Sequence, residues 1–319
     1  MMAAPSHTPV LLAETLQYLD LRRGGSYIDC TVGLGGHSAA IAEAMGPHGR
    51  LLCIDQDSEA LEFARAKLSS FGSALNFVHG NFADLAEIAA GAGFDAVDGI
   101  LMDLGVSSLQ FGEAERGFAF ALEGPLDMRM DQRSAGTTAG EIVNTWEASA
   151  LADLFYQYGE ERQSRRIAAA VVAARPLRTT WDLAKAVKQA VGGTRKATPT
   201  HPATKVFLAL RIRVNRELDR VSTGLPRAHS LLGFGTAGER GGRLVVISFH
   251  SLEDRIVKQY LRSEAQDCLC PPELPVCRCG HRATLRLLMR RAVRPAAAEV
   301  AANPRARSAV LRAAERVAP

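Results

Sequence analysis

The stretch SYIDCTVGLGGHS at residues 26–38 decides the fold of this chain. Its first part, Ser26–Cys30, predicts a short buried strand, and a helix is expected over Gly36–Met45. Between them lies a turn rich in glycine, a residue that lets the backbone adopt positive φ and approach a ligand closely. The turn therefore predicts either a ligand site or a plain connection between strand and helix.

Strands and helices alternate beyond this stretch. Further strands are predicted at Leu51–Ile54, Leu75–Val78 and Val97–Met102, with helical segments between them. Such alternation implies right-handed crossovers and a parallel, doubly wound sheet. A strong fifth strand, Arg243–Phe249, resumes the pattern late in the chain, and two β-like segments close it.

The alternation stops between about Arg129 and Pro226, where only helical periodicity and turn residues occur. We therefore predict one α/β domain, made of residues 1–130 and 227–319, with a helical domain at 131–226 inserted after the fourth strand. The inserted helices are expected at Glu147–Tyr158, Gln163–Ala174, Thr180–Val191 and Ala203–Val221.

The composition is that of a soluble globular protein, with 319 residues, 47% of them hydrophobic and 23% charged. No apolar stretch approaches the roughly 20 residues of a membrane helix, and no export signal is evident. Six cysteines are too few for a disulfide scaffold, so a reducing cytoplasm is expected.

The net charge of +4 is unevenly distributed along the chain. Residues 161–220 contain 14 Lys and Arg against 4 Asp and Glu, and residues 282–316 contain 9 against 2. Two basic segments on an acidic body are typical of a protein that binds a polyanion. Solvated helix faces rich in arginine are the alternative.

Asp55 ends the second strand about twenty residues after the glycine turn. A carboxylate there can accept both hydroxyls of a ribose, which NAD and S-adenosylmethionine both carry; a helix N-cap is the alternative. The glycine spacing discriminates between the cofactors, because Ser38 stands where a dinucleotide fingerprint has its third glycine. A nicotinamide-dependent oxidoreductase is therefore disfavoured.

Two more side chains follow strands at the same expected edge. Phe82 comes just after the third strand, where an aromatic ring can pack on adenine or simply belong to the core. Asp103 ends the fourth strand, and its carboxylate can accept a hydrogen bond from an amino group of the cofactor or of the substrate.

Six motifs then point to a family, in the order TVGLGGHS (31–38), DLGVSS (103–108), GPLDMRMD (124–131), HPATKVFLALRIRVNREL (201–218), SFHSLEDRIVK (248–258) and NPRARSAVLR (303–312). From His7 to Arg312 the chain resembles the bacterial 16S ribosomal RNA cytosine N4-methyltransferases. The resemblance implies a class I, Rossmann-like methyltransferase sheet with an inserted all-helical domain. It also implies methyl transfer from S-adenosylmethionine to the exocyclic N4 of the decoding-centre cytosine usually numbered 1402.

The resemblance further implies which residues contact the cofactor: Gly35, Gly36, His37, Asp55, Phe82, Asp103 and Gln110. The family usually has proline before that glutamine, whereas this chain has Leu109, so the role of Gln110 is less secure. The implied substrate is 16S ribosomal RNA within the small ribosomal subunit, with no membrane and no obligate protein partner.

Methyl transfer needs alignment more than a strong base. Asp103 is the candidate catalytic residue, as an acceptor for the hydrogens of the target amino group, with cofactor binding as the alternative. His250 follows the fifth strand and is predicted either to contact the substrate or to be satisfied by the local turn.

A basic stripe is expected on the helix Ala203–Val221, opposite its apolar face. It consists of Lys205, Arg213, Arg216 and Arg220, which would contact RNA phosphates or form a solvated face. A non-enzymatic RNA-binding protein would keep this stripe but would not need Asp55 beside a glycine turn.

Four cysteines, Cys268, Cys270, Cys277 and Cys279, lie close together near the C-terminus. Paired zinc ligands usually have two to four residues between them, whereas here only one residue separates each pair. We therefore expect a reduced, proline-rich loop and no metal.

Overall fold

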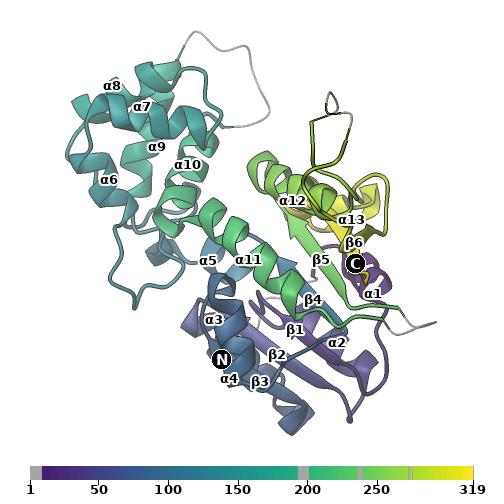
Figure 1. The fold of residues 1–319 in the computed structure, drawn as a ribbon. Coiled ribbons are helices and arrows are strands. Elements are labelled where there is room, and N and C mark those ends of the chain that lie inside the picture. The colour runs from purple at the N-terminus through teal and green to yellow at the C-terminus, as the bar shows by residue number, and fades with distance from the viewer. Residues whose placement is uncertain (1–8, 193–200, 236–239, 272–273, 275, 319) are drawn as a thin grey trace. The chain divides into compact units, whose positions relative to one another are not determined.

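The glycine turn joins strand β1 to helix α2 in a doubly wound α/β sheet (Figure 1). The computed structural model describes residues 9–192, 201–235, 240–271, 274 and 276–318. Within them, seven strands pair in the order β3-β2-β1-β4-β5-β7-β6. Their bounds are β1 Ser26–Asp29, β2 Arg50–Asp55, β3 Leu75–His79, β4 Gly99–Asp103, β5 Arg243–Ser248, β6 Leu285–Leu287 and β7 Val310–Arg316.

Strands β1 to β5 are parallel, whereas β7 is antiparallel to β5 and to β6. Successive strands run outward from β1 to β2 and β3 on one side, and to β4 and β5 on the other. Ligands of open α/β sheets bind where the strand order reverses in this way, beyond the carboxyl ends of the strands. The predicted α/β sheet is confirmed, and the reversal places its binding edge at β1.

Alternate residues of each strand face two different cores, so both faces of the sheet are covered. Ile28, Leu52 and Ile100 belong to one hydrophobic cluster, whereas their neighbours Tyr27 and Leu101 belong to the other. This period of two follows from the pleat. Around the sheet lie α1 Leu12–Leu19, α2 Gly36–Met45, α3 Ser58–Lys67, α4 Leu85–Gly91, α11 Glu217–Leu231, α12 Ser251–Glu264 and α13 Ala297–Ala302.

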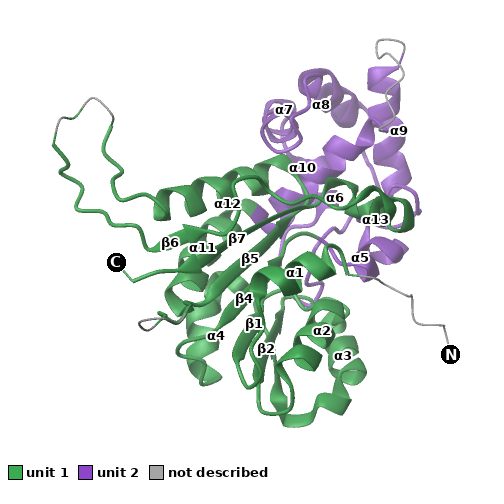
Figure 2. Ribbon diagram, turned by 90° about the vertical axis from the view of Figure 1, so that its right-hand side faces the viewer, with its two compact units in different colours: residues 1–105, 218–319 green, residues 106–217 purple. Residues whose placement is uncertain are grey.

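The chain divides into two compact units (Figure 2). Unit 1 comprises residues 1–105 and 218–319, and unit 2 comprises residues 106–217. Unit 2 contains α5 Ser108–Gly112, α6 Ala139–Thr145, α7 Ala148–Gln157, α8 Ser164–Ala173, α9 Thr180–Val191 and α10 Ala203–Asn215. Short 3-10 turns also occur at Ser69–Ala74, Phe82–Asp84, Ala114–Arg116 and Pro304–Ser308.

Unit 2 begins at Val106 rather than at the predicted residue 131. The reason is that the intervening segment, regular only in α5 and one 3-10 turn, contributes to the helical core through Phe118, Leu126 and Met128. The spacing of apolar residues could not predict this, because the segment has neither helical nor strand periodicity.

The predicted helix Ala203–Val221 is wrong, because it is broken into two. Helix α10 ends at Asn215, and Arg216 adopts left-handed backbone angles, φ 51° and ψ 39°. Helix α11 then begins at Glu217, and its Val221 and Leu225 pack into the core of the sheet. Since the two halves belong to different cores, unit 2 ends at Glu217 and not at the predicted residue 226.

Asn215 fixes the end of α10. Its Oδ1 accepts a hydrogen bond from the Met130 amide at 2.8 Å, and its Nδ2 donates to the Met128 carbonyl at 2.8 Å. The side chain is buried, so these bonds replace water. No described helix is both long and apolar enough to cross a membrane.

We expect Asn215→Ala to lower the free energy of unfolding by about 1–3 kcal/mol, because it removes the hydrogen bonds of Asn215 with the Met130 amide and the Met128 carbonyl in a buried setting. Urea titration of the full chain measures this. Gln157→Ala, an exposed change at the end of α7, is the control and should stay within about 0.5 kcal/mol. Equal stability of the two variants would contradict the role given to Asn215.

Candidate cofactor and catalytic site

The turn after β1 depends on glycine for two separate reasons. Gly33 and Gly35 have φ values of 51° and 73°, which side chains rarely tolerate. Gly36 instead lacks room, because a Cβ there would lie 2.4 Å from Cγ of Pro9. Gly35 and Gly36, both predicted to contact the cofactor, therefore shape the turn and the first residue of α2.

Asp55 connects this turn to the end of β2. Its Oδ2 accepts a hydrogen bond from the Gly33 amide at 2.7 Å, and its Oδ1 accepts one from the Asp57 amide at 2.8 Å. The alternative role of Asp55 as a helix cap is wrong, because Asp57 caps α3. Burial raises the pKa of Asp55 to about 6, although both amide hydrogen bonds oppose the shift.

Asp29 lies beneath the turn and was not among the predicted site residues. It is buried, and it accepts hydrogen bonds from the Ser38 hydroxyl at 2.6 Å and the Thr31 amide at 3.1 Å. Burial raises its pKa to about 6. The only signal for it in the sequence is its place as the last residue of β1, a position equivalent to those of Asp55 and Asp103 in their strands.

Asp103 ends β4, where its amide donates to Oγ1 of Thr31 at 2.7 Å. Its carboxylate oxygen Oδ1 is buried and has no hydrogen-bond partner among the residues that the structure describes. Burial, and then the negative charges of Asp29 and Glu253, raise the pKa of Asp103 well above its ordinary value. A buried acceptor without a partner indicates a site for a donor that is not part of the chain.

His37 contacts the second oxygen of Asp103. Its Nε2 lies 3.1 Å from the Val10 carbonyl, and its Nδ1 lies 3.5 Å from Oδ2 of Asp103. A carbonyl only accepts, so Nε2 must carry a proton. The ring, predicted to contact the cofactor, is thereby oriented by the backbone and orients Asp103 in turn.

Phe82 is largely enclosed in the core of unit 1, with 8% of its surface exposed. Helix α11 packs against it so closely that a Cβ on Gly224 would lie 2.6 Å from Cδ2 of its ring. Beside it, Asn81 donates to Oε1 of Gln56 at 2.8 Å, and Arg220 also donates to that oxygen. Adenine binding by Phe82 stays a prediction, while its packing role is evident.

The four predicted RNA-contacting cations do not form one stripe, because of the break at Arg216. Lys205 donates to the Glu160 carbonyl at 2.7 Å, and the Arg213 guanidinium lies 5.3 Å from the centre of the Trp146 ring. Arg220 belongs to α11 and to unit 1. The predicted stripe is therefore wrong as a single surface of one helix.

Gln110 and His250 both act as local caps. Gln110, in unit 2, accepts a hydrogen bond from the Ser107 amide at 2.9 Å in the capping box of α5.

His250 immediately precedes α12. Its Nδ1 accepts from the Glu253 amide at 3.4 Å, and its Nε2 lies 3.1 Å from Oε1 of Glu253. The local turn thus accounts for Nδ1 of His250, whereas its buried Nε2 makes no hydrogen bond with the residues that the structure describes. Substrate contact by His250 stays a prediction.

The MraW methylase family model matches residues 4–317. The chain is 54% identical over 316 residues to the ribosomal RNA small subunit methyltransferase H of Thermomicrobium roseum, covering 98% of this chain and 94% of that protein. It is 51% identical over 314 residues to the same-named protein of Syntrophotalea carbinolica, covering 98% of each. A solved O-methyltransferase from Thermotoga maritima superposes with a TM-score of 0.41 at 12% identity, covering 100% of this chain and 69% of that one; this likeness is too distant to bear on function.

We expect binding of S-adenosylmethionine to weaken as the pH falls through about 6, because Asp55 then takes up a proton and cannot accept from both ribose hydroxyls. Asp29 titrates in the same range. Asp55→Asn should weaken binding at least about tenfold at neutral pH, equivalent to about 1.4 kcal/mol. Isothermal titration at several pH values measures both effects.

The matched control is Asp57→Asn, two residues away. Asparagine is an equally good helix cap, so α3 and the cofactor affinity should both persist. If the two variants bind S-adenosylmethionine equally well, the ribose does not contact Asp55.

Proposed function

Because the chain belongs to the MraW methylase family, we propose that it methylates ribosomal RNA of the small subunit. The specific target proposed is the exocyclic N4 of a cytosine in the decoding centre of 16S ribosomal RNA. The names of the two relatives support the class of substrate. The observation in this chain that supports transfer to an amino group is the partnerless Oδ1 of Asp103 at the carboxyl edge of the sheet.

S-adenosylmethionine is the methyl donor, and the carboxylates at the sheet edge fit it. Asp29, Asp55 and Asp103 are buried close enough for the charge of Asp29 to raise the pKa of the other two. A ligand bearing a sulfonium and an ammonium group relieves this repulsion, whereas a phosphate-bearing ligand would increase it. When bound, S-adenosylmethionine supplies an electrophilic methyl group on a positively charged sulfur.

Asp103 then has a defined task at the target base. The lone pair of N4 is delocalised into the cytosine ring, so this nitrogen is a poor nucleophile. By accepting a hydrogen bond from the amino group, Oδ1 of Asp103 keeps that group oriented and stabilises the positive charge that develops on it. Orientation of this kind is worth up to roughly 7–11 kcal/mol in favourable cases.

Asp103→Asn should lower kcat by at least about 10²-fold, because the amide is a weaker acceptor and takes no proton. The cofactor affinity of the variant separates the two roles open to Asp103. Unchanged affinity supports contact with the target amino group, and lost affinity supports contact with the cofactor. Asp95→Asn, an exposed change before β4, is the control; a fully active Asp103→Asn enzyme would refute both roles.

We propose that unit 2 contributes the cations that bind RNA. The reaction would take place in the cytoplasm, and the substrate would be the RNA within the small ribosomal subunit rather than free RNA. Arg213 and Arg216 are exposed, and both lie at the end of α10. Residues 161–220 carry 14 Lys and Arg against 4 Asp and Glu, which supports this placement. Measuring the rate of methylation with each substrate tests this: isolated small subunits should be methylated faster than free 16S ribosomal RNA.

Replacing Arg213 and Arg216 with glutamine should weaken RNA binding and flatten the dependence of log affinity on log salt by roughly two units. S-adenosylmethionine binding should not change. The control replaces Arg23 and Arg50, which lie at the amino ends of β1 and β2, away from the site edge. If both double variants keep the parent's slope, the RNA must instead contact the basic segment 282–316.

A further inference from the structure

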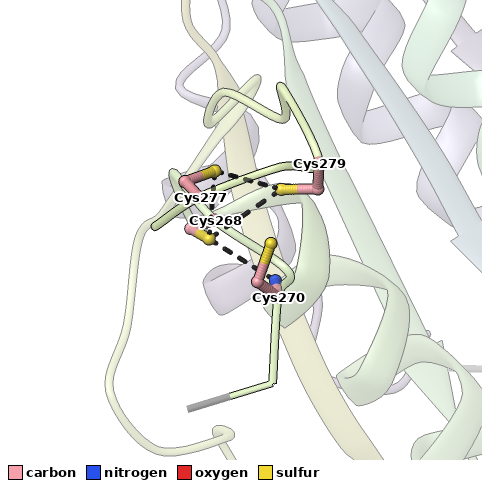
Figure 3. A group of neighbouring side chains, drawn as sticks. All are labelled: Cys268, Cys270, Cys277 and Cys279. Atoms are coloured by element: carbon pink, nitrogen blue, oxygen red, sulfur yellow. Dashed lines mark hydrogen bonds between the residues drawn. The ribbon is translucent and has the colours of Figure 1, made fainter. Parts of the chain in front are cut away.

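Four cysteines converge in the segment that connects α12 to β6 (Figure 3). The Sγ atom of Cys268 lies 3.4 Å from that of Cys277 and 3.8 Å from that of Cys279, and the last two are 3.6 Å apart. Cys270 completes the group, and all four sulfurs lie within 4.8 Å of one another. None is joined in a disulfide, which would require about 2.05 Å between sulfurs.

The separations among Cys268, Cys277 and Cys279 match the edges of a tetrahedron around one metal ion, and Cys270 lies close enough to be the fourth ligand. A zinc–sulfur distance of about 2.3 Å places tetrahedral thiolates about 3.8 Å from one another. An iron–sulfur cluster would have to fit several irons and sulfides between the same thiolates. The space within this group is therefore suited to a single ion.

Backbone amides surround the sulfurs as well. The Leu269 amide donates to Sγ of Cys279 at 3.3 Å, and the Arg278 amide donates to Sγ of Cys270 at 3.3 Å. The Cys270 amide donates to Sγ of Cys268 at 3.4 Å. Such hydrogen bonds orient metal ligands and stabilise the negative charge of thiolates.

The geometry points to a structural zinc site formed by Cys268, Cys270, Cys277 and Cys279. Zinc is the expected ion because it prefers thiolates in a closed tetrahedral set. The one-residue spacing, which led us to expect no metal, is compatible with this arrangement. Where a chain is extended, residues i and i+2 point to the same side, so each Cys-x-Cys pair presents both sulfurs to one ion.

A metal would add a strong cross-link to the hydrogen bonds that join the described parts of this segment. At its base, the Thr284 amide donates to the Glu264 carbonyl at the end of α12 at 2.8 Å, and the Ala283 amide donates to the Asp267 carboxylate, just beyond α12, at 3.2 Å. Farther out, the described side chains of Leu269 and Val276 are 46% and 68% exposed, so these two do not form an apolar core between the arms. Metal ligation commonly replaces a hydrophobic core in such small elements. The site would thus order a segment that Figure 2 shows leaving the end of α12 and returning to β6.

The test measures metal in the full chain, purified under reducing conditions without chelator. Elemental analysis should find about one zinc per chain, and replacement by Co²⁺ should give the visible absorption of a tetrahedral thiolate site. Cys277→Ser with Cys279→Ser should abolish both signals. The control, Cys30→Ala with Cys53→Ala, also removes two cysteines, but from the core, and should keep the metal.

Thiol reactivity gives a second measurement on the unmodified chain, in case a variant fails to fold. The four cysteines of the group are not buried, yet a thiol reagent should not modify them until a strong chelator is added. Without chelator, immediate reaction of these thiols in zinc-supplemented protein would overturn the proposal. So would a disulfide among them in protein alkylated at lysis, or an unchanged zinc content in the Cys277/Cys279 variant.

Discussion

The hydrogen bond from the Gly33 amide to the Asp55 carboxylate joins the turn after β1 to the end of β2, and the geometry of the binding edge depends on it. Gly33 also has a φ of 51°, a backbone conformation that glycine adopts far more readily than residues with a side chain. The carboxylate in turn needs the bond, since a buried charge without donors is costly. With the Asp57 amide on its other oxygen, Asp55 is held in position before any ligand binds. The glycine turn and the aspartate at the end of β2 therefore form one hydrogen-bonded unit, and each fixes the position of the other.

The same edge is electrostatically unfavourable as it stands. Asp29, Asp55 and Asp103 come from three neighbouring strands, and burial raises the pKa of each. Buried carboxylates of like charge lower the stability of the fold compared with apolar residues of similar size. Their arrangement is explained by a cationic ligand, whose binding recovers the free energy lost in burying them together. In the proposed site, this negative charge and the missing third glycine would both favour S-adenosylmethionine over a dinucleotide.

The sheet could be predicted because its signals are local: strands such as Leu75–His79 alternate between two cores, and aspartates or glycines follow them directly. The break at Arg216 could not, because the apolar spacing of Ala203–Val221 continues through it. What ends α10 is the contact of Asn215 with Met128 and Met130, more than eighty residues away in sequence. The missed Asp29 has a similar cause, since only the pairing of β1 with its neighbours brings its carboxylate close to those of Asp55 and Asp103.

The release of a proton sets the last constraint on the proposed reaction. Nε2 of His37 donates to the Val10 carbonyl. A hydrogen bond between Nδ1 of His37 and Oδ2 of Asp103 therefore needs a second proton, carried either by Nδ1 or by the carboxyl group. In the free protein the raised pKa of Asp103 favours keeping that proton on the carboxyl group. Next to a bound sulfonium, the Asp103 carboxylate would be stabilised in its ionised form and could accept a hydrogen bond from the target amino group. Once the methyl group has moved, the positive charge lies on the amino nitrogen and the sulfur is neutral. In the proposed mechanism, Asp103 would then regain its high proton affinity when the nitrogen must lose a proton, so this mechanism needs no separate strong base.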